Sequence, residues 1–114
     1  MPFIETGRQV SFLPSVTATT TATTSTQVVL GQFAGGLMTI ISGAPTAISL
    51  EFWIVPDDGL SVPVQIYTTA GAAVTVSVVN NKAYPLPDEV FAAKIITFRV
   101  GSGGPVVFTL STKT

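Results

Sequence analysis

The sequence predicts an all-β protein: an antiparallel β-sandwich of jelly-roll type, or a small barrel, with about eight strands. We also expect an extended N-terminal arm and one short helical turn. The first supporting observation is alternation of apolar and other residues in short runs, of which Ala47–Val55 is the clearest. That run places four apolar side chains on one face of a strand, namely Ile48, Leu50, Phe52 and Ile54. The second observation is that Gly, Pro and Asn separate these runs at short intervals.

The expected strands follow one another with short connections. In chain order they are Arg8–Leu13, Gln27–Phe33, Leu37–Ser42, Ala47–Val55, Val62–Thr68, Ala73–Val79, Lys94–Val100 and Pro105–Ser111. Glycine accepts positive φ angles, so we expect two hairpins, one turning at Ala34–Gly36 and the other at Gly101–Gly104. The second glycine cluster is not a phosphate-binding loop, because no Lys-Ser/Thr pair and no helix follow it.

The segment Tyr84–Ala93 is where the short helical turn is expected. Pro87 can occupy an early helical position, since proline needs no amide hydrogen there. Asp88 and Glu89 then suit the positive N-terminal end of the helix, which is the structural explanation for these two carboxylates.

The first 26 residues differ in composition from the rest. Nine of the twelve residues from Ser15 to Thr26 are Ser or Thr. Threonine is β-branched and favours extended backbone, but it contributes little apolar area for burial. We therefore divide the chain into an extended arm or edge strand at 1–26 and a β-sandwich domain at 27–114. The residues expected to dock the arm on a partner are Val16, Thr17, Thr19, Thr21 and Thr23.

The composition excludes several classes of function. The chain has no His and no Cys, which removes imidazole and thiolate ligands and the usual general base. Its five Lys and Arg and six Asp and Glu give a net charge of -1, without the basic excess typical of nucleic-acid binding. No apolar run approaches the roughly 18 residues of a membrane helix. We expect no enzyme, catalytic residue, metal, cofactor, nucleic-acid partner or membrane partner.

One aromatic and acidic group is a candidate interface or ligand platform. Glu51, Trp53 and Val55 share the face of their strand that points away from the core. Tyr67 and Tyr84 could extend such a platform for a sugar. Because aromatic residues are also enriched at subunit contacts, we favour an interface or plain packing over a ligand platform.

The pair Asp57 and Asp58, followed by Gly59, is a candidate for Ca²⁺ binding or acid-base chemistry. No ordered series of oxygen ligands follows, and Asp and Gly are common in turns. We interpret this segment as a turn. A hydrolase that uses Asp57, Asp58 or Glu51 is the weakest hypothesis for the chain.

Three features together suggest a family. They are the Ser/Thr-rich segment Ser15–Thr26, the charge-poor strand-rich body and the C-terminal run Ile95–Lys113. In these features the chain resembles the small all-β decoration or cement proteins of tailed bacteriophage capsids. It lacks the strong charge complementarity with which some of them bind the capsid shell. The resemblance implies a structural protein on the capsid surface of the virion, often a homotrimer, whose partners are its own copies and other capsid proteins. The alternative is a carbohydrate-binding β-sandwich module that uses Trp53, Tyr67 and Tyr84.

Overall fold

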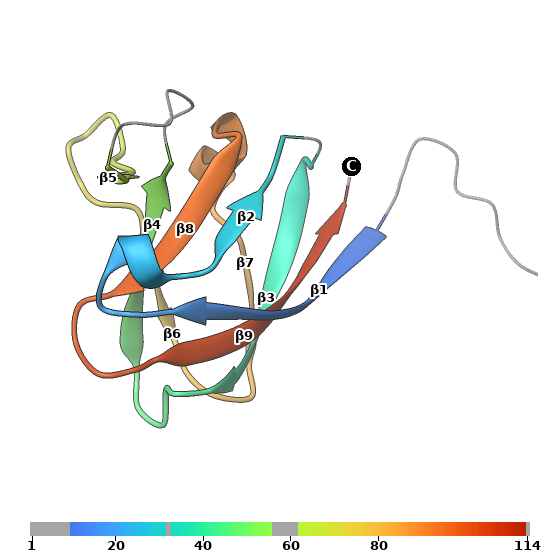
Figure 1. The fold of residues 1–114 in the computed structure, drawn as a ribbon, viewed down its shortest axis with the longest axis vertical. Helices are drawn as coiled ribbons and strands as arrows, with labels where there is room; N and C mark the ends of the chain where they lie inside the picture. The colour runs from blue at the N-terminus through green and yellow to red at the C-terminus, as the bar shows by residue number, and fades with distance from the viewer. Residues whose placement is uncertain (1–9, 32, 56–61, 114) are drawn as a thin grey trace, which may run out of the picture.

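Nine strands form two antiparallel sheets around one core in the computed structural model (Figure 1), which describes residues 10–31, 33–55 and 62–113 and only the backbone of 10–14. The first sheet contains, in spatial order, β1 (Val10–Ala18), β9 (Val106–Lys113), β3 (Gly35–Ser42) and β7 (Ala83–Pro85). The second contains β2 (Gln27–Val29), β8 (Ile95–Val100), β4 (Ile48–Ile54) and then β5 (Val64–Gln65), while β6 (Thr75–Val78) also pairs with β4. Two 3-10 helices, η1 (Ala22–Thr24) and η2 (Asp88–Ala92), complete the described elements.

The strand pairing is nested from the ends of the chain inward. β1 pairs with β9, β2 with β8, β3 with β7, and β4 with β5 and β6. This order is that of a double-sheet jelly roll, so the expected all-β, jelly-roll fold is confirmed and the barrel alternative is not adopted. The described residues contain nine strands rather than eight, because Ala83–Pro85 forms a short strand before the helical turn.

Three aromatic rings connect the two sheets. Phe98 on β8 contacts Phe52 on β4 edge-to-face, with ring centroids 5.7 Å apart. Phe98 also contacts Phe108, which lies on β9 in the opposite sheet, at 5.0 Å and an interplanar angle of 84°. All three side chains are fully buried, so this contact crosses the middle of the sandwich.

Both expected hairpins are wrong. β2 and β3 lie in different sheets, and Gly35 and Gly36 are part of β3 instead of a turn. β8 and β9 also lie in different sheets, so Gly101–Gly104 carries the chain from one sheet to the other. Gly103 and Gly104 both have a φ of 74°, as a glycine-rich turn allows. The local glycine signal is the same for a hairpin and for a connection that changes sheets.

The expected helical turn is η2, a single 3-10 element that follows Pro87 and has Asp88 and Glu89 in its first turn. Its Val90 side chain is fully buried and joins the core between the sheets. η2 therefore closes one end of the sandwich.

The Ser/Thr-rich segment Ser15–Thr26 begins within β1 and then folds back, so that Thr26 lies beside Thr17. The Thr17 amide donates to Thr26 Oγ1 at 3.1 Å, and the Thr26 amide donates to the Thr17 carbonyl at 3.0 Å. The Thr19 amide donates to Ser25 Oγ at 3.0 Å, while the Thr19 carbonyl accepts from the Val100 amide of the second sheet at 2.9 Å. The structure thus places this segment against the body, with β1 as an edge strand of the first sheet.

Replacement of Phe98 by Ala tests whether the aromatic contact holds the sheets together. We expect F98A to lower the free energy of unfolding by about 3–5 kcal/mol, the usual cost of removing a buried Phe. Urea denaturation measures this change, with S77A at an exposed strand position as the control. A loss below about 1 kcal/mol for F98A would contradict the assigned core.

Candidate functional site

The outer face of the β1-β9-β3-β7 sheet is uncharged over most of its area. Met38, Ile40, Phe108 and Leu110 point into the core, and the alternate positions therefore point outward. Within these four described strands, the charged residue is Lys113, at the end of β9. Lys113 points outward at the margin of this face. The uncharged outward residues, here called the neutral face, are Thr17, Leu37, Thr39, Ile41, Ser42, Ala83, Pro85, Val107, Thr109 and Ser111.

Two aliphatic side chains are exposed on the neutral face. Leu37 is 49% exposed and Ile41 is 48% exposed. Ile41 points outward by the same alternation as Leu37 and Thr39, and the register shift between Ile40 and Ser42 leaves the next residue, Ser42, exposed as well. Surfaces with apolar side chains and few charges are typical of the central part of subunit contacts.

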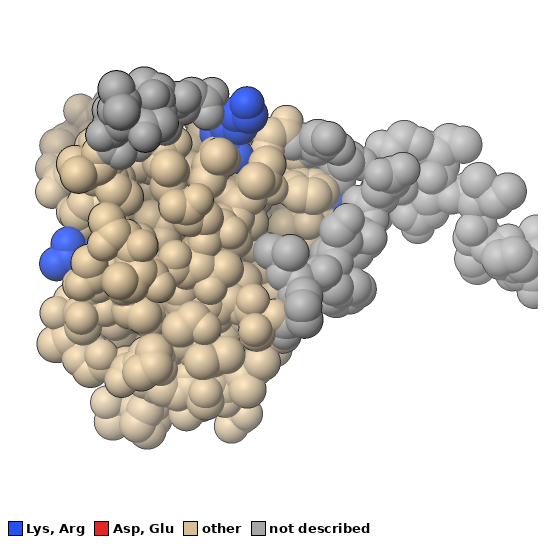
Figure 2. Space-filling view, in the orientation of Figure 1, with Lys and Arg blue, Asp and Glu red and all other residues tan. Residues whose placement is uncertain are grey.

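Charge is also sparse on the side of the molecule drawn in Figure 2. Lys and Arg atoms occupy small areas near the margins of that view, and no Asp or Glu atom is visible among the described residues. Such a surface has little charge with which to repel other copies of the chain.

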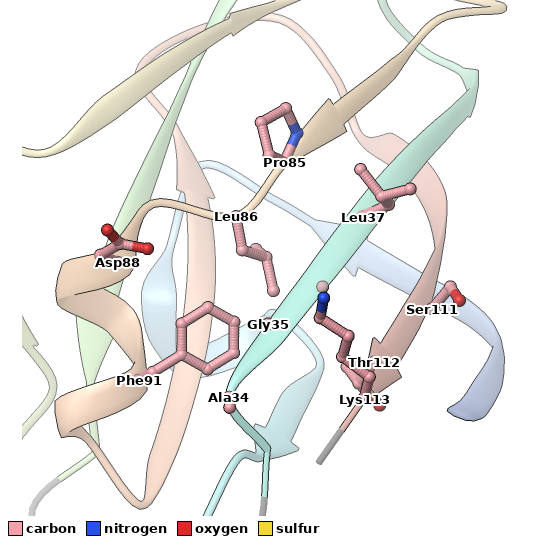
Figure 3. A pocket seen from close by; sticks show the side chains of 11 residues that line it. Ala34, Gly35, Leu37, Pro85, Leu86, Asp88, Phe91, Ser111, Thr112 and Lys113 are labelled. Atoms are coloured by element: carbon pink, nitrogen blue, oxygen red, sulfur yellow. The ribbon is translucent and has the colours of Figure 1, made fainter. Parts of the chain in front are cut away.

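A groove of about 510 Å³ continues from one end of the neutral face. It lies between the start of β3, the end of β9, β7 and η2 (Figure 3). Leu86 and Phe91 provide apolar walls, while Asp88 and Lys113 lie on opposite sides of the opening. The groove could therefore hold an extended segment that has apolar side chains and a charge of each sign.

Gly35 and Gly36 allow neighbouring atoms to approach the backbone closely beside this groove. A Cβ atom on Gly36 would lie 2.9 Å from Leu86 Cδ1 and 3.1 Å from the Ser111 carbonyl oxygen. A Cβ atom on Gly35 would lie 2.9 Å from Lys113 Cε. The sequence alone does not show that these glycines lie in a strand beside a groove, because the groove walls come from segments that are distant in the chain.

The structure brings Glu51 and Trp53 together on the outer face of the other sheet. Trp53 Nε1 donates a hydrogen bond to Glu51 Oε1 at 3.1 Å. Arg99, the cross-strand partner of Glu51, places its guanidinium carbon 5.1 Å from the centroid of the Trp53 ring. This cation-π contact covers a ring face that a sugar would need for stacking. Sequence reasoning missed Arg99 because spacing along one strand does not reveal the register of its neighbour.

The other candidate platform residues do not join this group. Tyr84 belongs to β7 in the opposite sheet from Trp53, packs against the core and accepts a hydrogen bond from the Val79 amide at 3.0 Å. Tyr67 follows β5 and is 56% exposed. Val55 is half-buried directly after β4. The three aromatic residues therefore do not form one continuous platform.

The residues expected to dock an arm have different environments. Val16 is fully buried in the core, and Thr17 and Thr19 are half-buried. Thr21 and Thr23 are exposed near η1. The Thr19 hydroxyl donates to the Thr21 carbonyl at 2.8 Å, so this hydroxyl group forms a hydrogen bond within the fold instead of being available to a partner.

The remaining sequence candidates provide no further site. Asp57, Asp58 and Gly59 lie outside the residues that the structure describes. In the described ranges, no three His, Cys, Asp or Glu side chains are grouped as a metal site would require. No helix in those ranges has the length and hydropathy needed to cross a bilayer.

Comparison with known proteins gives one structural likeness. No protein-family model and no curated protein matches the chain. The crystal structure of SPBc2 prophage-derived protein YomS matches it with a TM-score of 0.58 at 15% sequence identity, over 99% of this chain and 100% of that one. At this identity the likeness shows a shared fold over the whole length of both chains.

Replacement of Gly36 by Ala tests the close approach beside the groove. We expect G36A to lower the free energy of unfolding by about 1–3 kcal/mol, because the added methyl group would press on Leu86 and on a backbone oxygen. G31A is the control, since its Cβ would meet its nearest neighbour at 3.7 Å. Thermal denaturation that ranks G36A as no less stable than G31A would contradict this assignment.

Proposed function

We propose that this chain is a non-enzymatic structural protein of a phage particle, a decoration or cement protein that self-associates at the capsid surface. The observation that carries the proposal is the full-length likeness in fold to a prophage-derived protein. The jelly roll supports it, because this architecture is common in viral capsid proteins. Its partners would be other copies of the chain, as a homotrimer, and other capsid proteins.

The neutral face supports self-association. Placing an uncharged sheet surface against another subunit removes Leu37 and Ile41 from water without burying an unpaired charge. The opposite outer face is less suited, because Glu51 and Arg99 lie there and η1 covers part of it. There the Thr97 hydroxyl, which is fully buried, donates to the Ala22 carbonyl at 3.0 Å.

The carbohydrate-binding alternative has less support. Its three aromatic residues lie at separate places, and Arg99 covers a face of the Trp53 ring. Nucleic acid and membrane are not among the proposed partners, because the net charge of -1 offers no attraction to an anionic surface.

A single charge at the centre of the neutral face tests self-association. Thr39 is exposed and lies between Ala83 and Thr109 in the register of the sheet. We expect T39K to shift the chain from oligomer to monomer in analytical ultracentrifugation, since burial of an unpaired charge is costly. S77K, at an exposed strand position in the other sheet, is the matched control and should keep the wild-type mass. An oligomeric T39K variant would show that the contact lies elsewhere.

Detection in particles tests the location. We expect the chain in gradient-purified virions from cells that carry its gene, in a fixed ratio to the major capsid protein by quantitative mass spectrometry. Added chain should also cosediment with particles that lack it. A chain found in the lysate but absent from purified particles, with no cosedimentation, would count against a virion role.

A further inference from the structure

We propose that the groove between β3, β9, β7 and η2 binds residues 2–8 of a second copy of this chain, so that this segment of one copy links it to the groove of the next. This inference rests on the proposed self-association and names the segment and the site that form the link.

The groove lies at the end of the sheet where the N-terminal strand begins. Val10, the first residue of β1, pairs with Lys113 of β9, and Lys113 pairs on its other side with Gly35 of β3. Gly35 and Lys113 both line the groove. The start of β1 at Val10 therefore lies one strand spacing from Lys113 and two spacings, about 10 Å, from Gly35 on the other side of β9. The start of β1 and the groove therefore lie at the same end of the sandwich.

A second copy is the better source of the segment than the same chain. β9 lies between β1 and β3, so a chain filling its own groove would have to reverse over the end of β9. A span of nine residues can reach up to about 30 Å when extended, enough to enter the groove of an adjoining subunit. Contacts between two different surfaces of neighbouring copies also generate closed rings, which agrees with the proposed trimer.

The apolar part of the segment matches the groove walls. Phe3 and Ile4 are consecutive large apolar residues near the start of the chain. Leu86 is buried and Phe91 half-buried in the groove wall, and Leu37 lies exposed at its edge. An aromatic side chain inserted between such walls is typical of the anchors that dominate the energy of interfaces.

The charges of the segment match the groove opening. Glu5 and Arg8 are separated by three positions, so in an extended segment they point to opposite sides and lie about 10 Å apart. Asp88 and Lys113 lie on opposite sides of the groove (Figure 3). Arg8 can therefore approach Asp88 while Glu5 approaches Lys113, and this pairing sets the direction of the bound segment.

Deletion of residues 2–8 gives the first test. We expect the truncated chain to sediment as a monomer under conditions in which the full chain is oligomeric. A synthetic peptide of residues 1–9 with a C-terminal fluorophore should then bind the truncated chain in an anisotropy titration, and a scrambled peptide of the same composition should not. A truncated chain that keeps the mass of the full chain, or equal binding of both peptides, would overturn the proposal.

A charge exchange gives the second test. D88K in the truncated chain should weaken binding of the peptide by roughly threefold to tenfold, and an R8E peptide should restore it to that variant. E89K is the matched control, because Glu89 is an exposed neighbour of Asp88 that does not line the groove. Equal effects of D88K and E89K, or no rescue by the R8E peptide, would overturn the assigned contact.

The outcomes separate this inference from the proposed function. An oligomeric full chain whose mass is unchanged by the truncation overturns the groove assignment and leaves self-association standing. A full chain that is monomeric at all concentrations overturns self-association itself. If the full chain is monomeric and its truncated form still binds the peptide, the groove binds the N-terminal segment of its own chain, and the link between copies is overturned.

Discussion

Contact between the inner faces of the two sheets is the constraint on which the rest of this structure depends. Phe98 reaches across the core to Phe108, and neither sheet could hide its apolar face without the other. Side chains alternate along a strand, so the register that buries Phe108 and Leu110 also turns Val107 and Thr109 outward. The outer surfaces of the molecule are thus determined by the same pairing that builds its core.

The two outer faces that result are chemically different. On the face formed by β4 and β8, Arg99 lies over Trp53, Glu51 accepts a hydrogen bond from the Trp53 indole, and η1 covers Thr97. The charged side chains of Glu51 and Arg99 on that face thus both contact Trp53. In the described strands the neutral face exposes Leu37, and the charged residue beside it is Lys113 at its margin. This asymmetry is why we propose that copies associate through the neutral face and that the adjoining groove binds a segment of a neighbouring copy.

The strands and the fold class could be predicted from the sequence, because alternation such as that of Ala47–Val55 is a local property. The connections could not. Glycine at Gly35 and Gly36 suits a turn as well as a strand that packs closely against Leu86 and Ser111, and only contacts with distant residues distinguish the two.

The candidate sites were harder to predict from the sequence than the strands, because they are formed by residues that are distant in the chain. The groove joins residues from the start of β3, from η2 and from the end of β9, which are far apart in the chain. Arg99 joins Trp53 through the register of two neighbouring strands. The Ser/Thr-rich composition suggested an arm or an edge strand, but composition does not reveal that the hydroxyls of Thr26 and Ser25 accept hydrogen bonds from the amides of Thr17 and Thr19.

Hydroxyl-radical footprinting of the assembled chain is the most direct test of the claim that the neutral face is buried between subunits. The oxidation rates of Leu37 and Ile41 are measured in the oligomer and again after dilution to monomer, with exposed Tyr67 as the internal reference. The account predicts that oxidation of Leu37 and Ile41 rises severalfold on dilution while that of Tyr67 stays constant. Unchanged rates at Leu37 and Ile41 would contradict it, because the neutral face would then be open to solvent in the assembly.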